Sequence, residues 1–216
     1  MIGHQRDLEA PVFETVLVPL STGEAVPLRV GTIGTTLLTA ATELGLADLV
    51  ALIDAARITD DHGTLADIER MLARSSRRAG GAGLRRGVAL SRFGVRSRPE
   101  THLRLLLARA GFPEPQVAPR VETPIGLRHP DLAWPQWRVL VEYEGDGHRT
   151  DSRVFANDLQ RFDAFADAGW STVRCSRIDL YSAPRRVLES LARRLRSRGW
   201  RSTARLRTGI PPIAVP

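Results

Sequence analysis

The segment from residue 131 to residue 148 constrains the fold of this chain more than any other. Apolar and polar residues alternate between Val139 and Tyr143, which predicts a β-strand with a side-chain period of two. Glu142 and Glu144 are then neighbours on one face of this strand. Any fold built on this strand must accommodate adjacent negative charges on one side of a sheet.

The residues before this strand predict the other half of a hairpin. Pro135 and Gln136 suit a two-residue turn, because proline is pre-set for the first corner position. In the simplest register Asp131 pairs with Leu140 and lies diagonal to Glu142, roughly 7–8 Å away at the backbone. Two carboxylates at that separation can bind one hard divalent cation, and without a cation they repel each other. The alternative is a solvated acidic strand edge.

Length and composition predict a folded protein with a basic surface. A chain of 216 residues holds one large domain or two small ones and has enough apolar content for a core. All 31 basic residues are arginine, and the net charge is +7. The absence of lysine is explained by a GC-rich genome, but the positive balance remains. Basic domains have nucleic acid as their usual electrostatic partner, so we expect DNA.

The cysteine content and the first residues of the sequence indicate a cellular compartment. Cys175 is the single cysteine, and the residues after Met1 lack the apolar core of a signal peptide. We therefore expect a reducing, cytoplasmic environment. No stretch approaches 18 uninterrupted apolar residues, so we expect no membrane partner. The oligomeric state cannot be derived from these features.

Residues 1–95 predict a small, mostly helical module with a short β-hairpin. The expected hairpin strands are Thr15–Leu20 and Val26–Val30, around a turn that contains glycine. The expected helices are 35–43, 46–58, one that starts at the cap Thr64, and one from Leu84 to about Phe93. No residues in this module have catalytic spacing, which favours a packing or interaction scaffold.

Residues 96–200 predict a second domain, which contains both helices and strands. Ser97 and Glu100 form a capping-box pattern that opens a helix ending near Gly111. The expected elements after it are a strand at 121–125, the hairpin that starts at Asp131, a helix at 155–168, a strand at 171–175 and a helix at 184–198. The helix at 155–168 is expected to end at Gly169 and to carry an apolar stripe of Phe155, Leu159, Phe162 and Ala166. Residues 201–216 predict an irregular, mobile tail.

This order of elements resembles the PD-(D/E)xK nuclease superfamily over roughly residues 97 to 198. Within it, the chain is most similar to very-short-patch-repair-like endonuclease domains of the type called bacterial domain of unknown function 559. The residues that carry the resemblance are Asp131, Glu142-Tyr-Glu-Gly145, His148, Asp158 and Arg161. The resemblance implies an α/β fold of the restriction-endonuclease type, in which helices flank a mixed central sheet.

The resemblance also implies a metal site. Asp131 and Glu142 are expected to bind Mg²⁺ (or Mn²⁺), and Glu100 is expected to reach the site from its helix and hold a metal-bound water. Phosphodiester hydrolysis also calls for a metal ion, because the charge on the phosphate must be neutralised and a water molecule must be made nucleophilic. Glu100 has an equally good structural role in the capping box with Ser97.

The chain departs from the superfamily pattern two residues after Glu142. Glu144 occupies the position of the lysine in the name motif, so another group must help to position the water or move protons. Glu144 itself is one candidate. His148 is the second, because imidazole titrates near neutral pH. The alternative for His148 is an ordinary surface histidine.

Arginines and tryptophans near these acids are candidates for contacts with nucleic acid. Arg161 contacts either a phosphate or Asp158 within its own helix, and Arg174 has the same two kinds of role. For Trp134 and Trp137, a cross-strand aromatic pair is favoured over stacking on a base.

The sequence therefore predicts a metal-dependent endonuclease that acts on DNA. The alternative is a nucleic-acid-binding or regulatory protein, antitoxin-like or active in phage defence, that keeps the nuclease fold without cutting. Related bacterial proteins join such a domain to an antitoxin-like N-terminal region. Residues 1–95 look too short for a complete winged helix, so we expect a truncated start or the absence of that function. No zinc-ligand spacing, phosphate-binding loop or nucleophile elbow is present, which excludes those classes.

Overall fold

A computed structural model describes residues 13–59, 61–74, 79–145, 152–202 and 206–213, and for 152–159 only the backbone. The chain divides into two compact units, Met1–Ser91 and Arg92–Pro216. The predicted domain boundary after residue 95 lies close to this division.

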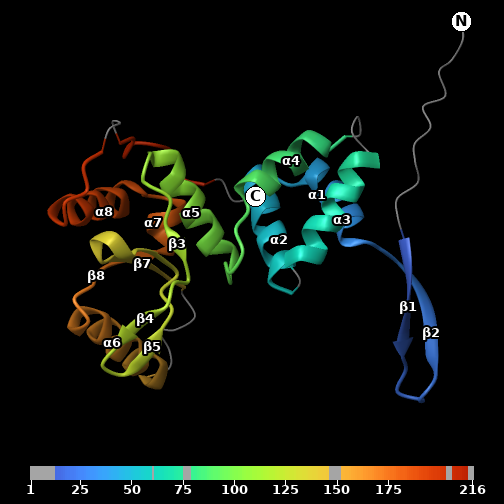
Figure 1. Cartoon of the computed structure of the whole chain (residues 1–216), viewed down its shortest axis with the longest axis horizontal. Helices are drawn as coiled ribbons and strands as arrows, with labels where there is room; N and C mark the ends of the chain where they lie inside the picture. The colour runs from blue at the N-terminus through green and yellow to red at the C-terminus, as the bar shows by residue number, and fades with distance from the viewer. Residues whose placement is uncertain (1–12, 60, 75–78, 146–151, 203–205, 214–216) are drawn as a thin grey trace, which may run out of the picture. The chain divides into compact units, whose positions relative to one another are not determined.

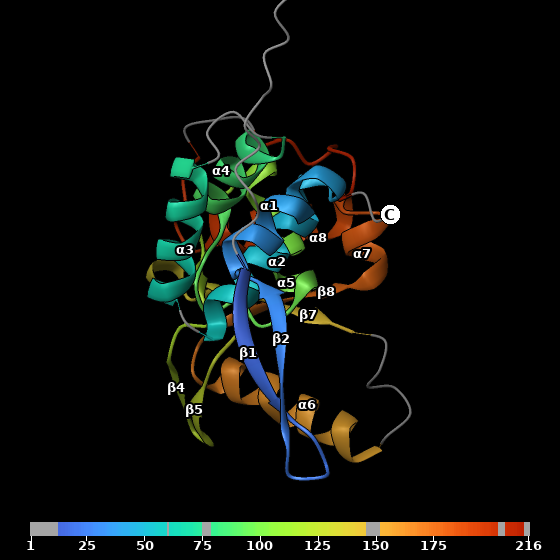
Figure 2. The same cartoon turned by 90° about the vertical axis from the view of Figure 1, so that its right-hand side faces the viewer.

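The first unit begins with a hairpin of two antiparallel strands, β1 (Phe13–Pro19) and β2 (Ala25–Gly31), which pair along their whole length in Figure 2. Four helices follow it within the described residues. They are α1 (Ile33–Glu43), α2 (Leu46–Thr59), α3 (Asp61–Arg74) and α4 (Gly81–Leu90). The predicted hairpin and helices are therefore present, with shifted ends.

The four helices share an apolar core. The fully buried side chains include Leu49, Ile53, Ile68 and Leu84, which come from α2, α3 and α4. The predicted cap at Thr64 is wrong, because α3 begins at Asp61 and the Thr64 hydroxyl donates instead to the Ala56 carbonyl at 3.1 Å. This unit therefore has the character of a packed helical scaffold.

The second unit is built around a mixed four-stranded sheet with the order β3-β6-β7-β8. Its strands are β3 (Gln116–Val117), β6 (Leu132–Trp134), β7 (Val139–Glu144) and β8 (Ser171–Ser176). β6 pairs antiparallel with β3 and β7, whereas β7 and β8 are parallel. The predicted mixed central sheet is therefore confirmed.

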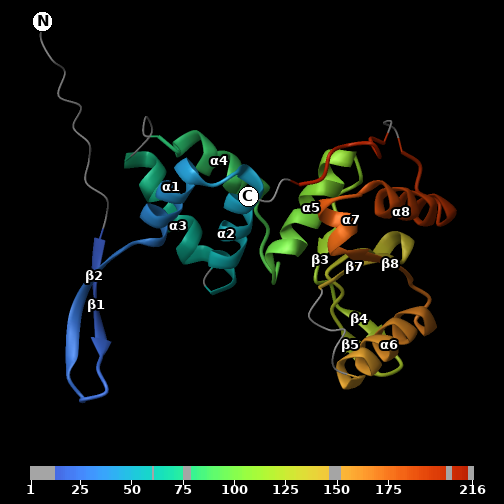
Figure 3. The same cartoon turned by 180° about the vertical axis from the view of Figure 1, so that it is seen from behind.

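Helices cover both faces of this sheet in Figures 1 and 3. α6 (Ser152–Asp167) lies on one side, together with the separate hairpin of β4 (Val121–Thr123) and β5 (Gly126–Arg128). α5 (Arg98–Ala110), α7 (Arg177–Tyr181) and α8 (Arg185–Ser197) lie on the other. No helix in the described ranges is both long and apolar enough to cross a membrane.

Successive side chains of β7 point to opposite faces of the sheet, so their positions along the strand decide which helices they face. Leu140 is fully buried and packs with Phe165 of α6, together with Val121 and Ala133. Residues two and four positions further on, Glu142 and Glu144, continue the same face of the strand. The sheet therefore presents these acids on the side covered by α6.

The register of the β6–β7 hairpin differs from the prediction. The two-residue turn at Pro135-Gln136 is replaced by a 3₁₀ turn, Pro135–Trp137, followed by Arg138 with a φ of +47°. Trp134 pairs with Val139, so the register is shifted by two residues. The expected pair of Trp134 and Trp137 is therefore wrong.

The tryptophans of this hairpin have separate structural roles. Trp134 is buried, and its indole N–H donates to the Pro113 carbonyl at 2.9 Å. Trp137 instead packs against Trp200, with 6.4 Å between ring centroids. Burial removes Trp134 from the surfaces on which an unpaired base could stack.

Two further expectations need correction. The strand expected at 121–125 is β4, which ends at Thr123 and pairs with β5 outside the central sheet. The predicted apolar stripe of α6 included Ala166, which is exposed, while Phe165 and Ala164 are buried. The helix is therefore rotated relative to the expectation, because the larger phenylalanine ring occupies the core.

The described part of the tail is irregular, as predicted, but it packs onto the domain. Residues 206–213 form no helix or strand. The Arg207 backbone N–H donates to the Ala110 carbonyl at the end of α5 at 3.0 Å, and Ile213 is buried. The expectation of a mobile tail therefore does not fit residues 206–213.

Leu140→Ala should lower the free energy of unfolding of the second unit by about 2–5 kcal/mol, because it opens a cavity between the sheet and α6. All four tryptophans lie in residues 134–200, so their fluorescence during urea unfolding reports on this unit alone. Ile178→Ala is the control, since this side chain is 68% exposed. Equal effects of the two substitutions would contradict the described packing.

Candidate functional site

Asp131 and Glu142 face each other across the β6–β7 hairpin. The observed register continues the pairing of Leu132 with Val141 by one residue, which places Asp131 directly opposite Glu142. The Asp131 N–H donates to Glu142 Oε1 at 3.3 Å, and the Tyr143 N–H donates to Asp131 Oδ2 at 2.8 Å. The predicted diagonal arrangement is therefore wrong, and the two carboxylates are closer than expected.

Desolvation raises the pKa of both acids, and the charge of a neighbouring acid adds to the rise in each case. Glu142 is 6% exposed, and desolvation, followed by the charge of Asp131, raises its pKa to about 8. Desolvation and the charge of Glu100 raise the pKa of Asp131 to about 6. Because the two acids interact, they titrate as a pair. Near neutral pH the pair holds a proton that separate surface acids would have lost.

Arg161 of α6 is the cation that contacts this pair. Its Nη2 lies 3.1 Å from Glu142 Oε1 and 3.0 Å from Oε2, and it also donates to the His129 carbonyl at 2.9 Å. The guanidinium lies 5.8 Å from the centre of the Phe165 ring. This contact joins α6 to a strand acid. The side chain of Asp158 lies outside the described residues, and both roles predicted for Arg161 stay predictions.

Glu100 lies near the pair, but its oxygens are used at the start of α5. Oε1 accepts from the Ser97 hydroxyl at 2.8 Å, and Oε2 accepts from the Arg96 N–H at 2.9 Å. Ser97 is the N-cap, and its hydroxyl accepts from the Glu100 N–H at 3.4 Å. Glu100 acts on Asp131 through its charge, since it raises the pKa of that acid.

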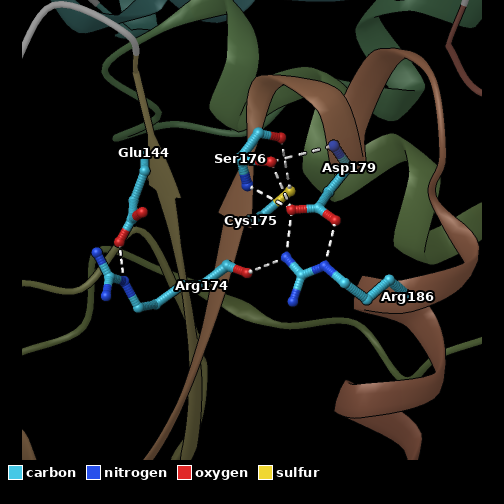
Figure 4. Close-up of polar contacts among 6 residues, drawn as sticks. All are labelled: Glu144, Arg174, Cys175, Ser176, Asp179 and Arg186. Atoms are coloured by element: carbon cyan, nitrogen blue, oxygen red, sulfur yellow. Dashed lines mark hydrogen bonds and ion pairs between the residues drawn. The ribbon is translucent and has the colours of Figure 1, made fainter. Parts of the chain in front are cut away.

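Glu144 and Arg174 form a separate ion pair on the same side of the sheet, as Figure 4 shows. The Arg174 guanidinium also lies over the Phe162 ring of α6, 4.7 Å from its centre. Both residues were predicted to serve the site, Glu144 in catalysis and Arg174 in phosphate binding. In the structure they neutralise each other at the edge of the sheet.

Figure 4 also shows a second polar cluster, at the end of β8. Asp179 accepts from the Ser176 N–H at 2.9 Å and forms an ion pair with Arg186. These bonds close the capping box of α7 and attach α8 to it. Cys175 is buried beside them, and desolvation raises the pKa of its thiol far above the usual range. The cluster therefore has a structural role and no free nucleophile.

His148 lies outside the described residues, and so does the side chain of Asp158. Their predicted roles stay predictions. Within the described ranges, no group of three or more histidine, cysteine, aspartate and glutamate side chains is placed to hold a metal ion. The described residues do place Asp131 and Glu142 opposite each other on adjacent strands.

The chemistry of this pair suits a hard divalent cation. Mg²⁺ is usually held by one or two carboxylates, and waters and substrate phosphates complete its octahedron. Asp131 and Glu142 supply two such groups from adjacent strands. Their pKa values are raised by desolvation first and by neighbouring acids second, and a cation would favour the ionised form of both. Glu142 must share its oxygens with Arg161 or be released by it to bind an ion.

Several residues of the site give little signal in the sequence. The hydrogen bonds of Arg96 to Glu100 and of His129 to Arg161 use backbone groups, which almost any residue can provide. Phe162 and Phe165 support the two arginines, and their helical spacing predicts core packing. Their second role becomes visible only when the position of α6 on the sheet is known.

Comparisons of the chain with models of protein families, with curated proteins and with solved structures find no match.

Glu142→Gln should change how stability depends on pH. The pair's raised pKa values mean that the folded chain binds protons more tightly than the unfolded chain, so the parent loses stability as pH rises from about 4 to about 8. Removing one acid reduces this loss. We expect the free energy of unfolding of the variant, relative to the parent, to increase by about 1–2 kcal/mol between pH 5 and pH 8.

Urea unfolding followed by tryptophan fluorescence measures this difference. Glu122→Gln is the control, because Glu122 is exposed on β4 of the same unit. A difference between Glu142→Gln and the parent that is the same at both pH values would contradict the raised pKa values of the pair.

Proposed function

We propose that this chain is a Mg²⁺- or Mn²⁺-dependent endonuclease that hydrolyses phosphodiester bonds in DNA, on a restriction-endonuclease-like fold of the PD-(D/E)xK type. The observation that carries the proposal is the pair of half-buried Asp131 and buried Glu142 on adjacent strands of a mixed sheet. The net charge of +7 favours a polyanionic substrate. A single, buried cysteine fits a cytoplasmic location.

Each residue of the pair has a defined part in this proposal. Asp131 and Glu142 hold the cation, which supplies positive charge at the scissile phosphate and a more acidic water. The bond from the Tyr143 N–H fixes Asp131 Oδ2, so this carboxylate is oriented by the strand itself. Burial of Glu142 excludes bulk water, which strengthens the attraction between its carboxylate and a cation.

Arg161 has two successive roles in the proposed reaction. In the free protein it neutralises Glu142 and prevents an uncompensated buried charge. A guanidinium released from Glu142 remains close enough to bind a phosphate oxygen. Its 34% exposed side chain can make this change without unfolding of the helix.

The same ion pair favours a second function, a nucleic-acid-binding or regulatory protein that does not cut. Arg161 Nη2 contacts both oxygens of Glu142, and Glu144 replaces the lysine of the superfamily motif while it pairs with Arg174. A protein that keeps these pairs permanently has no site for a cation. Such a binder predicts association with DNA that needs no metal.

Purified parent protein should fragment DNA only in the presence of Mg²⁺ or Mn²⁺. Asp131→Ala and Glu142→Gln should each lower the cleavage rate by more than about 100-fold, because a ligand to the cation is lost. The assay offers single- and double-stranded DNA with each metal and with EDTA.

Asp163→Asn is the matched control, because it removes an exposed acid from α6 and leaves the pair intact. It should cleave at the rate of the parent. If the parent binds DNA but fails to cleave it with either metal, the endonuclease proposal is wrong and the binding function takes its place.

A further inference from the structure

A hollow on the surface of the second unit is lined by arginine side chains. It encloses about 670 Å³ between α8 and the segment that follows this helix. Arg193 and Arg196 line it from the helix, and Arg201 lines it from the segment. We call it the arginine pocket. None of the residues predicted to act in catalysis lines it.

The positive charge of the arginine pocket is not neutralised by the chain around it. Within the described residues, no ion pair involves Arg193, Arg196 or Arg201. Glu189 is the acidic residue in the lining, and Arg185 already binds its carboxylate at 2.7 Å. The pocket therefore keeps an excess of positive charge that an anionic ligand can neutralise.

Contacts of Trp200 and of the tail hold the backbone around the arginine pocket in place. Trp200 is 8% exposed and stacks on Phe112, with 5.7 Å between centroids and 22° between planes. The Trp200 N–H donates to the Leu195 carbonyl at 2.9 Å, and the tail is attached to α5 through Arg207 and Ala110. The backbone that carries the arginines is therefore ordered before a ligand arrives, which lowers the entropic cost of binding.

The arginine side chains that line the pocket favour a ligand with phosphate groups. A guanidinium binds phosphate oxygens through two parallel N–H bonds, and several of them at one place favour a ligand with more than one phosphate. Volumes of about 300–1,000 Å³ accommodate ligands much larger than a single inorganic ion. We propose that the arginine pocket binds the phosphate backbone of a nucleic acid strand.

This contact is separate from the carboxylate pair. Arg194 of α8 donates to the Ser171 hydroxyl at the start of β8, whereas Glu142 lies further along the parallel strand β7 and faces α6. α8 covers the other face of the sheet (Figure 1). The inference goes beyond the proposed function, because a strand can be held here whether or not it is cut.

The test measures the binding of a fluorescein-labelled 30-base-pair duplex to the full chain in EDTA, so that cleavage plays no part. A triple variant, R193Q/R196Q/R201Q, is compared with the parent over a series of salt concentrations. We expect at least about ten-fold weaker binding at low salt, and a slope of log K against log salt that is smaller by about 2–3. The triple lysine variant should restore most of the slope, because lysine also neutralises phosphate.

The control variant R29Q/R70Q/R86Q removes the same charge from exposed positions that do not line the pocket. It should leave the slope close to that of the parent. An equal loss in both triple variants would overturn the proposal, because binding would then follow net charge alone. Inorganic pyrophosphate that competes at the concentration of the duplex would also overturn it and indicate a small phosphate compound.

Duplex binding by Asp131→Ala distinguishes failure of the endonuclease proposal from failure of the arginine-pocket proposal. Asp131→Ala should bind the duplex in EDTA as the parent does, whatever the outcome of the cleavage assay. Loss of duplex binding in Asp131→Ala equal to that of the triple glutamine variant would contradict the separation of the two sites.

Discussion

The placement of half-buried Asp131 opposite buried Glu142 is the constraint on which the site depends. Two carboxylates that share a hydrogen-bonded hairpin cannot both be ionised cheaply in a buried environment. The structure reduces this cost with the positive charges of Arg161 and Arg96, and with protons retained near neutral pH. We propose that a divalent cation bound by both carboxylates would offset the remaining cost.

The backbone geometry of the fold places the two acids opposite each other. The antiparallel pairing of β6 with β7 sets their separation, and the core around Leu140 and Phe165 fixes the face on which they lie. α6 then brings Arg161 onto that face. The same layer holds Arg174 against Glu144, so arginine and carboxylate alternate across the side of the sheet that α6 covers.

The elements of the second unit were largely predictable, because their periodicity and their end signals are local. Ser97 caps α5, and Gly111 and Gly169 follow α5 and α6 with positive φ, as their sequence patterns indicated. The register of the hairpin was not predictable. It depends on Arg138 in the left-handed region, a conformation that an arginine rarely adopts and that no neighbouring residue signals. This one residue places Asp131 opposite Glu142 and not diagonal to it. The partner of Arg161 was equally hidden, because it depends on how α6 packs across the sheet.

The central claim is that Asp131 and Glu142 together bind one divalent cation, and calorimetry tests it without substrate. Mn²⁺ is titrated into the full chain at pH 7 in two buffers that differ in ionisation enthalpy. We predict one bound ion per chain with release of protons, because the pair retains protons until a cation replaces them. Asp131→Asn should abolish this binding. Binding that is unchanged in Asp131→Asn, or that releases no protons, would contradict the account.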